Sequence, residues 1–91
     1  MRTSEQKVLS IVRSHIDPGA QVVNNTSKGT EVSILCPHPD HHDTSRGNCF
    51  LNLKKQYWNC FSCGEYGSLQ KALKFCHASG VTLPQINPLD L

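Results

Sequence analysis

The chain has 91 residues, of which 37% are hydrophobic and 18% are charged, and its formal net charge is +2. A chain of this length can form one domain with a thin core, and domains this small often depend on a metal or on disulfides for stability. The modest charge does not predict strong non-specific attraction to nucleic acid, so any such binding has to come from a local patch.

The five cysteines are an odd number, and no positively charged start followed by an apolar stretch marks a secretory signal. Both observations argue against a secreted protein held together by disulfides. No run of about 18 apolar residues is present, so no membrane span and no membrane partner are predicted. Together these features favour a reducing, cytoplasmic setting.

The first part of the chain predicts a helix followed by a β-hairpin. Apolar residues recur at helical spacing over residues 3–16, a capping box stands at the start, and Asp17-Pro18-Gly19 ends the run. Residues 21–26 and 30–35 form two extended runs separated by a Ser-Lys-Gly turn. The second strand of this hairpin delivers Cys36.

The middle of the chain predicts a loop and a second hairpin. Residues 37–48 are rich in Pro, His, Asp, Ser, Arg and Gly, which is typical of a loop. Residues 48–53 and 56–61 then form a hairpin around Lys54-Lys55, and its second strand delivers Cys60.

The last part of the chain predicts a helix and a tail. The helix begins after Ser68 as N-cap, carries His77 in its final turn and ends at Gly80. Residues 81–91 contain two prolines and show no periodicity, so they are predicted to be a tail or linker. The chain is therefore predicted to be a single domain over residues 1–80.

Two short cysteine motifs can close a tetrahedral zinc site. Cys36 opens the first motif, and Cys60-Phe61-Ser62-Cys63-Gly64 forms the second. Three thiolates and one imidazole are a common ligand set of structural zinc sites. Backbone amides in the second turn can point at the thiolates, and Gly64 can take a positive φ. We predict one structural Zn²⁺ ion, with a metal core over residues 36–64.

Three histidines compete to be the fourth ligand: His38, His41 and His42. His38 stands only two positions after Cys36, a spacing that strains a tetrahedral corner, whereas His41 lies near the upper limit of the usual first spacer. The predicted ligand is His41, with His42 as the alternative.

Neither a redox role for the Cys-x-x-Cys motif nor a ligand role for the two remaining cysteines is predicted. A thioredoxin-like redox role for the Cys-x-x-Cys motif would need a strand–helix–strand context that this sequence lacks. Cys49 falls in a strand and Cys76 on the apolar stripe of the last helix, so both are predicted to be buried apolar residues and not ligands.

The stretch from Cys36 to about Phe75 resembles the zinc-binding domain of bacterial-type (DnaG-like) primases, which also occurs in phage and plasmid primases and primase-helicases. The matching motifs are Cys36-Pro37, a Pro-Asp-His series ending at His41, the run Tyr57-Trp58-Asn59-Cys60-Phe61-Ser62-Cys63-Gly64, and Gly67-Ser68. The chain departs from the family pattern where Arg46-Gly47-Asn48-Cys49 replaces a Pro-Ser pair and where Ser68 replaces Asp, although both Ser and Asp cap helices.

Residues and resemblance together predict an α+β fold, a small zinc-ribbon-type antiparallel sheet of about four strands flanked by an N-terminal and a C-terminal helix. The resemblance implies a module that recognises single-stranded template DNA and supports primer synthesis by a separate primase catalytic domain or helicase-primase partner.

The predicted DNA contacts are basic side chains in turns and loop, together with rings on the second hairpin: Lys28, Arg46, Lys54, Lys55, Tyr57 and Trp58. Phe50 and Tyr66 offer further rings, whereas Phe61 is expected to be packed by the cysteine turn. Because strand side chains alternate, Tyr57 and Trp58 must face opposite sides of the sheet.

The chain is not predicted to be an enzyme, because no Asp-x-Asp pair stands at a strand end to hold the magnesium ions of nucleotidyl transfer. The competing prediction is a structural zinc ribbon that mediates protein–protein contacts in a replication or mobile-element complex without binding DNA.

Overall fold

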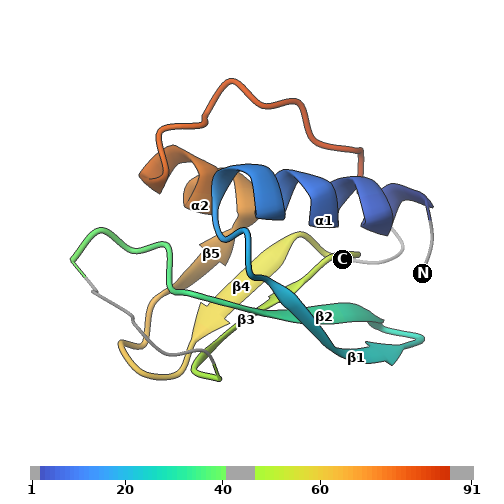
Figure 1. Ribbon diagram of the computed structural model, residues 1–91, viewed down its shortest axis with the longest axis horizontal. Coiled ribbons are helices and arrows are strands. Elements are labelled where there is room, and N and C mark those ends of the chain that lie inside the picture. The colour runs from blue at the N-terminus through green and yellow to red at the C-terminus, as the bar shows by residue number, and fades with distance from the viewer. Residues whose placement is uncertain (1–2, 41–46, 87–91) are drawn as a thin grey trace.

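Two helices lie over one face of an antiparallel sheet in the computed structural model, which describes residues 3–40 and 47–86 (Figure 1). The elements in chain order are α1 (Thr3–His15), β1 (Gln21–Thr26), β2 (Gly29–Ile34), β3 (Cys49–Asn52), β4 (Tyr57–Cys60), β5 (Tyr66–Ser68) and α2 (Leu69–Phe75). The five strands lie side by side in the same order as in the sequence, and all neighbours are antiparallel.

This arrangement confirms the predicted α+β class. The four predicted strands are present, with ends that differ from the predicted ones by at most one residue. The sheet is larger than predicted because β5, which pairs with β4 and runs directly into α2, adds a fifth strand.

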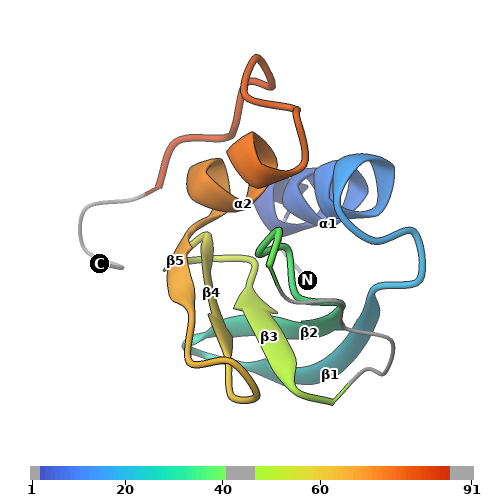
Figure 2. The ribbon, with the colours of Figure 1, turned by 90° about the vertical axis from the view of Figure 1, so that its left-hand side faces the viewer.

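The core lies between the sheet and the helices (Figure 2). On the sheet side, alternate residues of β2, β3 and β4 point toward the helices and are fully buried. In register they form two rows across the sheet: Val32–Leu51–Trp58 and Ile34–Cys49–Cys60. The second row ends at a cysteine, so the core and the candidate metal site share a wall.

The N-terminal helix α1 contributes Val8, Leu9 and Val12 to the same core. From the last turn of α1, the Arg13 guanidinium donates two hydrogen bonds to the carbonyl oxygen of Ala20, from Nε at 3.1 Å and Nη2 at 2.9 Å. These bonds hold the connection from the helix into β1.

The C-terminal helix α2 is shorter than predicted. Ser68 is its N-cap, as expected, because its side chain accepts a hydrogen bond from the backbone N–H of Lys71. The helix ends at Phe75, and His77 lies beyond it with φ of +60° instead of in its final turn. The N–H of Ala78 bonds back to the Leu73 carbonyl at 2.8 Å, which closes a Schellman-type end before Gly80 is reached.

Residues 81–86, which the sequence assigns to a tail or linker, run as coil across the helices (Figure 1). Val81 and Leu83 pack against the core, and the Gln56 side-chain amide donates a 2.7 Å hydrogen bond to the Pro84 carbonyl. Among the helices of the described ranges, none is both long and apolar enough for a membrane span.

Candidate metal centre and the open sheet face

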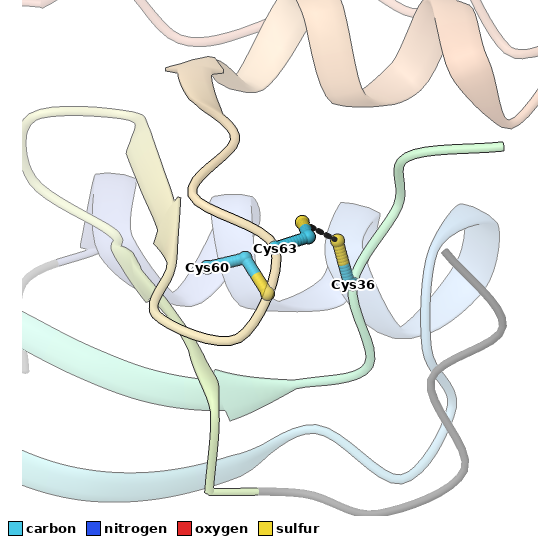
Figure 3. Close-up of side chains that lie close together, drawn as sticks. All are labelled: Cys36, Cys60 and Cys63. Carbon is cyan, nitrogen blue, oxygen red and sulfur yellow. Dashed lines mark hydrogen bonds between the residues drawn. The ribbon is translucent and has the colours of Figure 1, made fainter. Parts of the chain in front are cut away.

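Three cysteines gather at one end of the sheet, as the sequence predicts (Figure 3). The sulfur atoms of Cys36, Cys60 and Cys63 all lie within 4.8 Å of one another, and Cys36 Sγ is 3.7 Å from Cys63 Sγ. A tetrahedral zinc ion with Zn–S bonds of about 2.3 Å requires sulfurs about 3.8 Å apart. These three residues can therefore hold a metal ion of this kind.

Hydrogen bonds of the backbone N–H groups hold the two cysteine motifs in place. The Asp17 carboxylate accepts a 3.0 Å hydrogen bond from the N–H of Leu35, which fixes the chain just before Cys36. At the second motif, the N–H of Gly64 donates to the Cys60 carbonyl at 2.9 Å, and Gly64 has a φ of +78°, as predicted. A glycine adopts this conformation at little cost, so the turn can bring Cys63 back toward Cys60.

Backbone amides also point at the sulfurs, an arrangement that stabilises thiolates around a metal. Burial alone would raise the pKa of Cys60. The N–H groups of Cys63 and Ser62 and the thiols of Cys63 and Cys36 donate hydrogen bonds that outweigh it, so the pKa of Cys60 is lowered from its ordinary value. Cys60 therefore becomes a thiolate ligand more readily than its burial alone would allow.

Cys36 has the opposite tendency. Burial, with a smaller contribution from the neighbouring sulfurs of Cys63 and Cys60, raises the pKa of its thiol to about 12, although the backbone hydrogen bond from His38 acts in the opposite direction. Three thiols at this distance cannot all ionise without a cation to offset their charge. The cluster therefore has the chemistry of a site that could hold a metal ion.

The fourth ligand is not identified among the described residues. The predicted His41 and its alternative His42 lie outside them. His38, which the sequence argues against, does not join the cysteine cluster. Its Nδ1 accepts a 3.2 Å hydrogen bond from the N–H of Asp40, and its Nε2 lies 3.9 Å from a carboxylate oxygen of Glu65.

The two remaining cysteines also lie outside the cluster. Cys49 is fully buried, as predicted. Cys76 is only half-buried because it caps the end of α2, and burial raises its pKa. Neither stands close enough to the three clustered sulfurs to complete the site.

The sheet face turned away from the helices carries aromatic rings. Tyr57, Phe61 and Tyr66 are 45%, 71% and 60% exposed, and Phe50 is half-buried among them. The ring centroids of Phe50 and Phe61 lie 5.9 Å apart, and those of Tyr57 and Tyr66 lie 6.4 Å apart. Exposed rings of this kind are the platform on which single-stranded nucleic acids stack their bases.

Two expectations about these rings need correction. Trp58 faces the core, is fully buried and donates from Nε1 to the Ser68 carbonyl, so its ring is not available to a base. Phe61 is not packed by the cysteine turn. It continues the alternation of β4 one step beyond the strand, which places it on the same side as Tyr57. That alternation is the sequence signal by which Phe61 could have been found.

Three lysines lie together at the other end of the sheet. The Asn52 side chain accepts from the N–H groups of Lys54 and Lys55 and donates to the carbonyl of Lys28, which holds the β1–β2 and β3–β4 turns side by side. Arg46, which the sequence also predicts to contact DNA, lies outside the described residues. The lysines and the cysteines are thus at opposite ends of β4, with the open face between them.

Comparisons of the chain with protein-family models, with curated proteins and with solved structures find no match. The likeness to primase zinc-binding domains therefore rests on the sequence motifs. The function is inferred from the cysteine cluster, the aromatic rings of the open sheet face and the group of three lysines.

Proposed function

We propose that this chain is the zinc-binding module of a DNA primase-type replication protein. It holds one structural zinc ion through Cys36, His41, Cys60 and Cys63, and it binds single-stranded template DNA. Primer synthesis belongs to a separate catalytic domain or to a helicase-primase partner, because the sequence offers no carboxylate pair for nucleotidyl transfer.

The observation that carries the proposal is the open sheet face. Three of the five large apolar side chains exposed on the described surface are the rings of Tyr57, Phe61 and Tyr66, and all three lie on this face. A purely structural zinc ribbon gains nothing from exposing rings to water. A base stacked on such a ring typically contributes about 1 to 3 kcal/mol, without requiring a particular sequence.

Lysine placement supports the same function. A DNA strand that lies along β4 would pass from the rings to a group of three lysines: Lys28, Lys54 and Lys55. No acidic residue stands in the β1–β2 turn or in the β3–β4 turn. Lysines at this position supply the phosphate contacts that a net charge of only +2 does not provide for the molecule as a whole. Together, a few phosphate contacts and one or two stacked bases give a Kd of about 10⁻⁶ to 10⁻⁴ M.

A titration with fluorescent single-stranded DNA at two salt concentrations tests the proposal. The Lys54→Ala/Lys55→Ala double variant should flatten the salt dependence by about two phosphate contacts, because each lost contact removes about one counterion from the slope. Replacing Lys7 and Lys74, exposed lysines of the helices, removes the same charge elsewhere and should leave the slope almost unchanged.

The rings are tested separately. Phe61→Ala should weaken DNA binding with little change in the salt slope, because stacking releases no counterion. If the zinc-loaded parent did not bind single-stranded DNA at all, the proposal would be wrong, and a module for protein–protein contacts would become the better explanation.

A further inference from the structure

Two asparagines lie on the open face of the central strands, and their side chains have different roles. The Asn52 amide is engaged at both its oxygen and its nitrogen, since it accepts from the N–H groups of Lys54 and Lys55 and donates to the carbonyl of Lys28. The Asn59 side chain, in contrast, makes no hydrogen bond with any residue of the described ranges. Asn52 holds two turns together, whereas the amide of Asn59 has no such structural role within these ranges.

The position of Asn59 relative to the rings is fixed by the strand register. Asn59 on β4 pairs with Phe50 on β3 and with Tyr66 on β5. Neighbouring strands lie about 4.8 Å apart, so a ring stands next to Asn59 on each side. Along β4 itself, Tyr57 and Phe61 lie two residues before and two residues after Asn59, on the same face. The half-buried amide of Asn59 is therefore surrounded by four rings in two pairs.

A base that stacks on one of these rings covers its own face and leaves its edge free. Side chains of a strand stand roughly perpendicular to the sheet, so a base lying over Phe50 or Tyr66 presents an edge to the amide between them. That amide offers a carbonyl acceptor beside an N–H donor. It can pair with any base edge that has a donor and an acceptor next to each other.

We propose that Asn59 is the residue that gives this surface a preference for adenine in single-stranded DNA; the inference rests on the proposed function. Adenine carries its N6 amino donor next to a ring-nitrogen acceptor on both edges, at N1 and at N7, and so meets the amide in either orientation. The major-groove edge of guanine presents two acceptors, so guanine, like the pyrimidines, offers an adjacent donor and acceptor on its Watson–Crick edge but not on its major-groove edge. A neutral amide also lacks the cation that favours guanine.

The experiment measures anisotropy of labelled dA, dC and dT twelve-mers with the zinc-loaded chain. The parent should bind dA about twofold more tightly than dT, because two edges of adenine fit the amide and only one edge of thymine does. Asn59→Ala should bring the two affinities together while retaining the salt slope and most of the binding to dT. Asn24→Ala, at an exposed asparagine of β1, is the matched control and should keep the preference.

Asn59→Asp covers the case in which the alanine variant loses zinc. It has nearly the same shape, but a carboxylate only accepts, so the adenine preference should disappear here too. The inference is overturned if the parent binds all three oligonucleotides with equal affinity. It is also overturned if both Asn59→Ala and Asn59→Asp keep the preference for dA. Both results would leave DNA binding itself intact. If none of the oligonucleotides bound, the proposed function would fail, and this inference with it.

Discussion

Cys36 and Cys60 hold their protons with unequal strength, although their sulfurs belong to one cluster. Cys60 ends a strand and is followed by a tight turn, so two backbone N–H groups reach its sulfur. Cys36 is followed by Pro37, which has no N–H to offer, and a backbone hydrogen bond from His38 acts to lower its pKa. Burial therefore dominates at Cys36 and the amides dominate at Cys60.

This difference predicts how zinc affinity depends on pH. The pKa of Cys36 is raised to about 12, so the metal-free thiol is protonated at neutral pH, and binding as a thiolate must release that proton. From this proton alone the apparent affinity should fall about tenfold for each pH unit of acidification. The lowered pKa of Cys60 makes the contribution of its proton to the slope smaller than that of Cys36. Competition with a chromophoric chelator between about pH 7 and pH 8 measures the slope, and a flat profile would contradict this assignment.

The identity of the fourth zinc ligand can be tested by replacing single histidines. His41→Ala should lose zinc, while His38→Ala should keep it, because the His38 ring bonds to Asp40, faces Glu65 and stacks edge-on to Phe75 at 5.3 Å. Zinc content after gel filtration distinguishes the variants. If His42→Ala were the damaging change instead, the spacing argument would be off by one residue.

At the scale of elements, the sequence predicts what depends on local pattern and misses what depends on pairing. The alternation of apolar and polar residues predicts the hairpin strands. Cys36, Cys60 and Cys63 meet because two of these strands, β2 and β4, end at the same end of the sheet. β5 has only three residues, too few for a pattern of period two, and it is a strand because Tyr66 pairs with Asn59.

The rings illustrate the same limit. Alternation shows that Tyr57 and Trp58 face opposite sides but not which side is covered by helices, and this decides that Trp58 is buried. The approach of Phe50 to Phe61 requires the register between β3 and β4, which no single strand reveals. The lysine group likewise depends on Asn52 holding two turns together.

The junction of those turns is sensitive at Gly29. It has a φ of +120°, and an added Cβ would lie 2.5 Å from Asn52 Oδ1 and 2.7 Å from Lys54 Cβ. Gly29→Ala should therefore cost about 1 to 3 kcal/mol of unfolding free energy and move the lysines apart. Gly80→Ala is the matched control, since a Cβ there meets nothing within 4 Å and should be close to neutral. Thermal unfolding of the two zinc-loaded variants compares them, and equal midpoints would rule out a tight junction.

On the scale of the whole molecule, one thin core serves both ends of the sheet. The row Ile34–Cys49–Cys60 runs from the core into the metal site, and the row Val32–Leu51–Trp58 lies beside it. Helices cover only one face, so the sheet cannot bury its other side to gain stability (Figure 2). A metal bound by the three clustered cysteines would therefore supply stability that a larger protein obtains from a second layer.

Removing zinc should consequently unfold the entire domain and not only the cysteine turn. Structural zinc contributes on the order of 10 kcal/mol in small domains, more than a single core of this size supplies. Trp58 is the one tryptophan of the chain and is fully buried, so its fluorescence should shift to the red as a chelator is added. Loss of backbone circular dichroism should follow the same curve.

Two cysteine variants give the same argument a control. Cys60→Ser should prevent folding even with zinc present, because it removes a clustered sulfur whose pKa is lowered toward the thiolate form and exchanges a buried apolar atom in the core row. Cys76→Ser, at a half-buried position beyond α2, should lower stability only slightly. A chelated protein that kept its Trp58 emission would show that the core is sufficient alone, and that the three cysteines serve something other than stability.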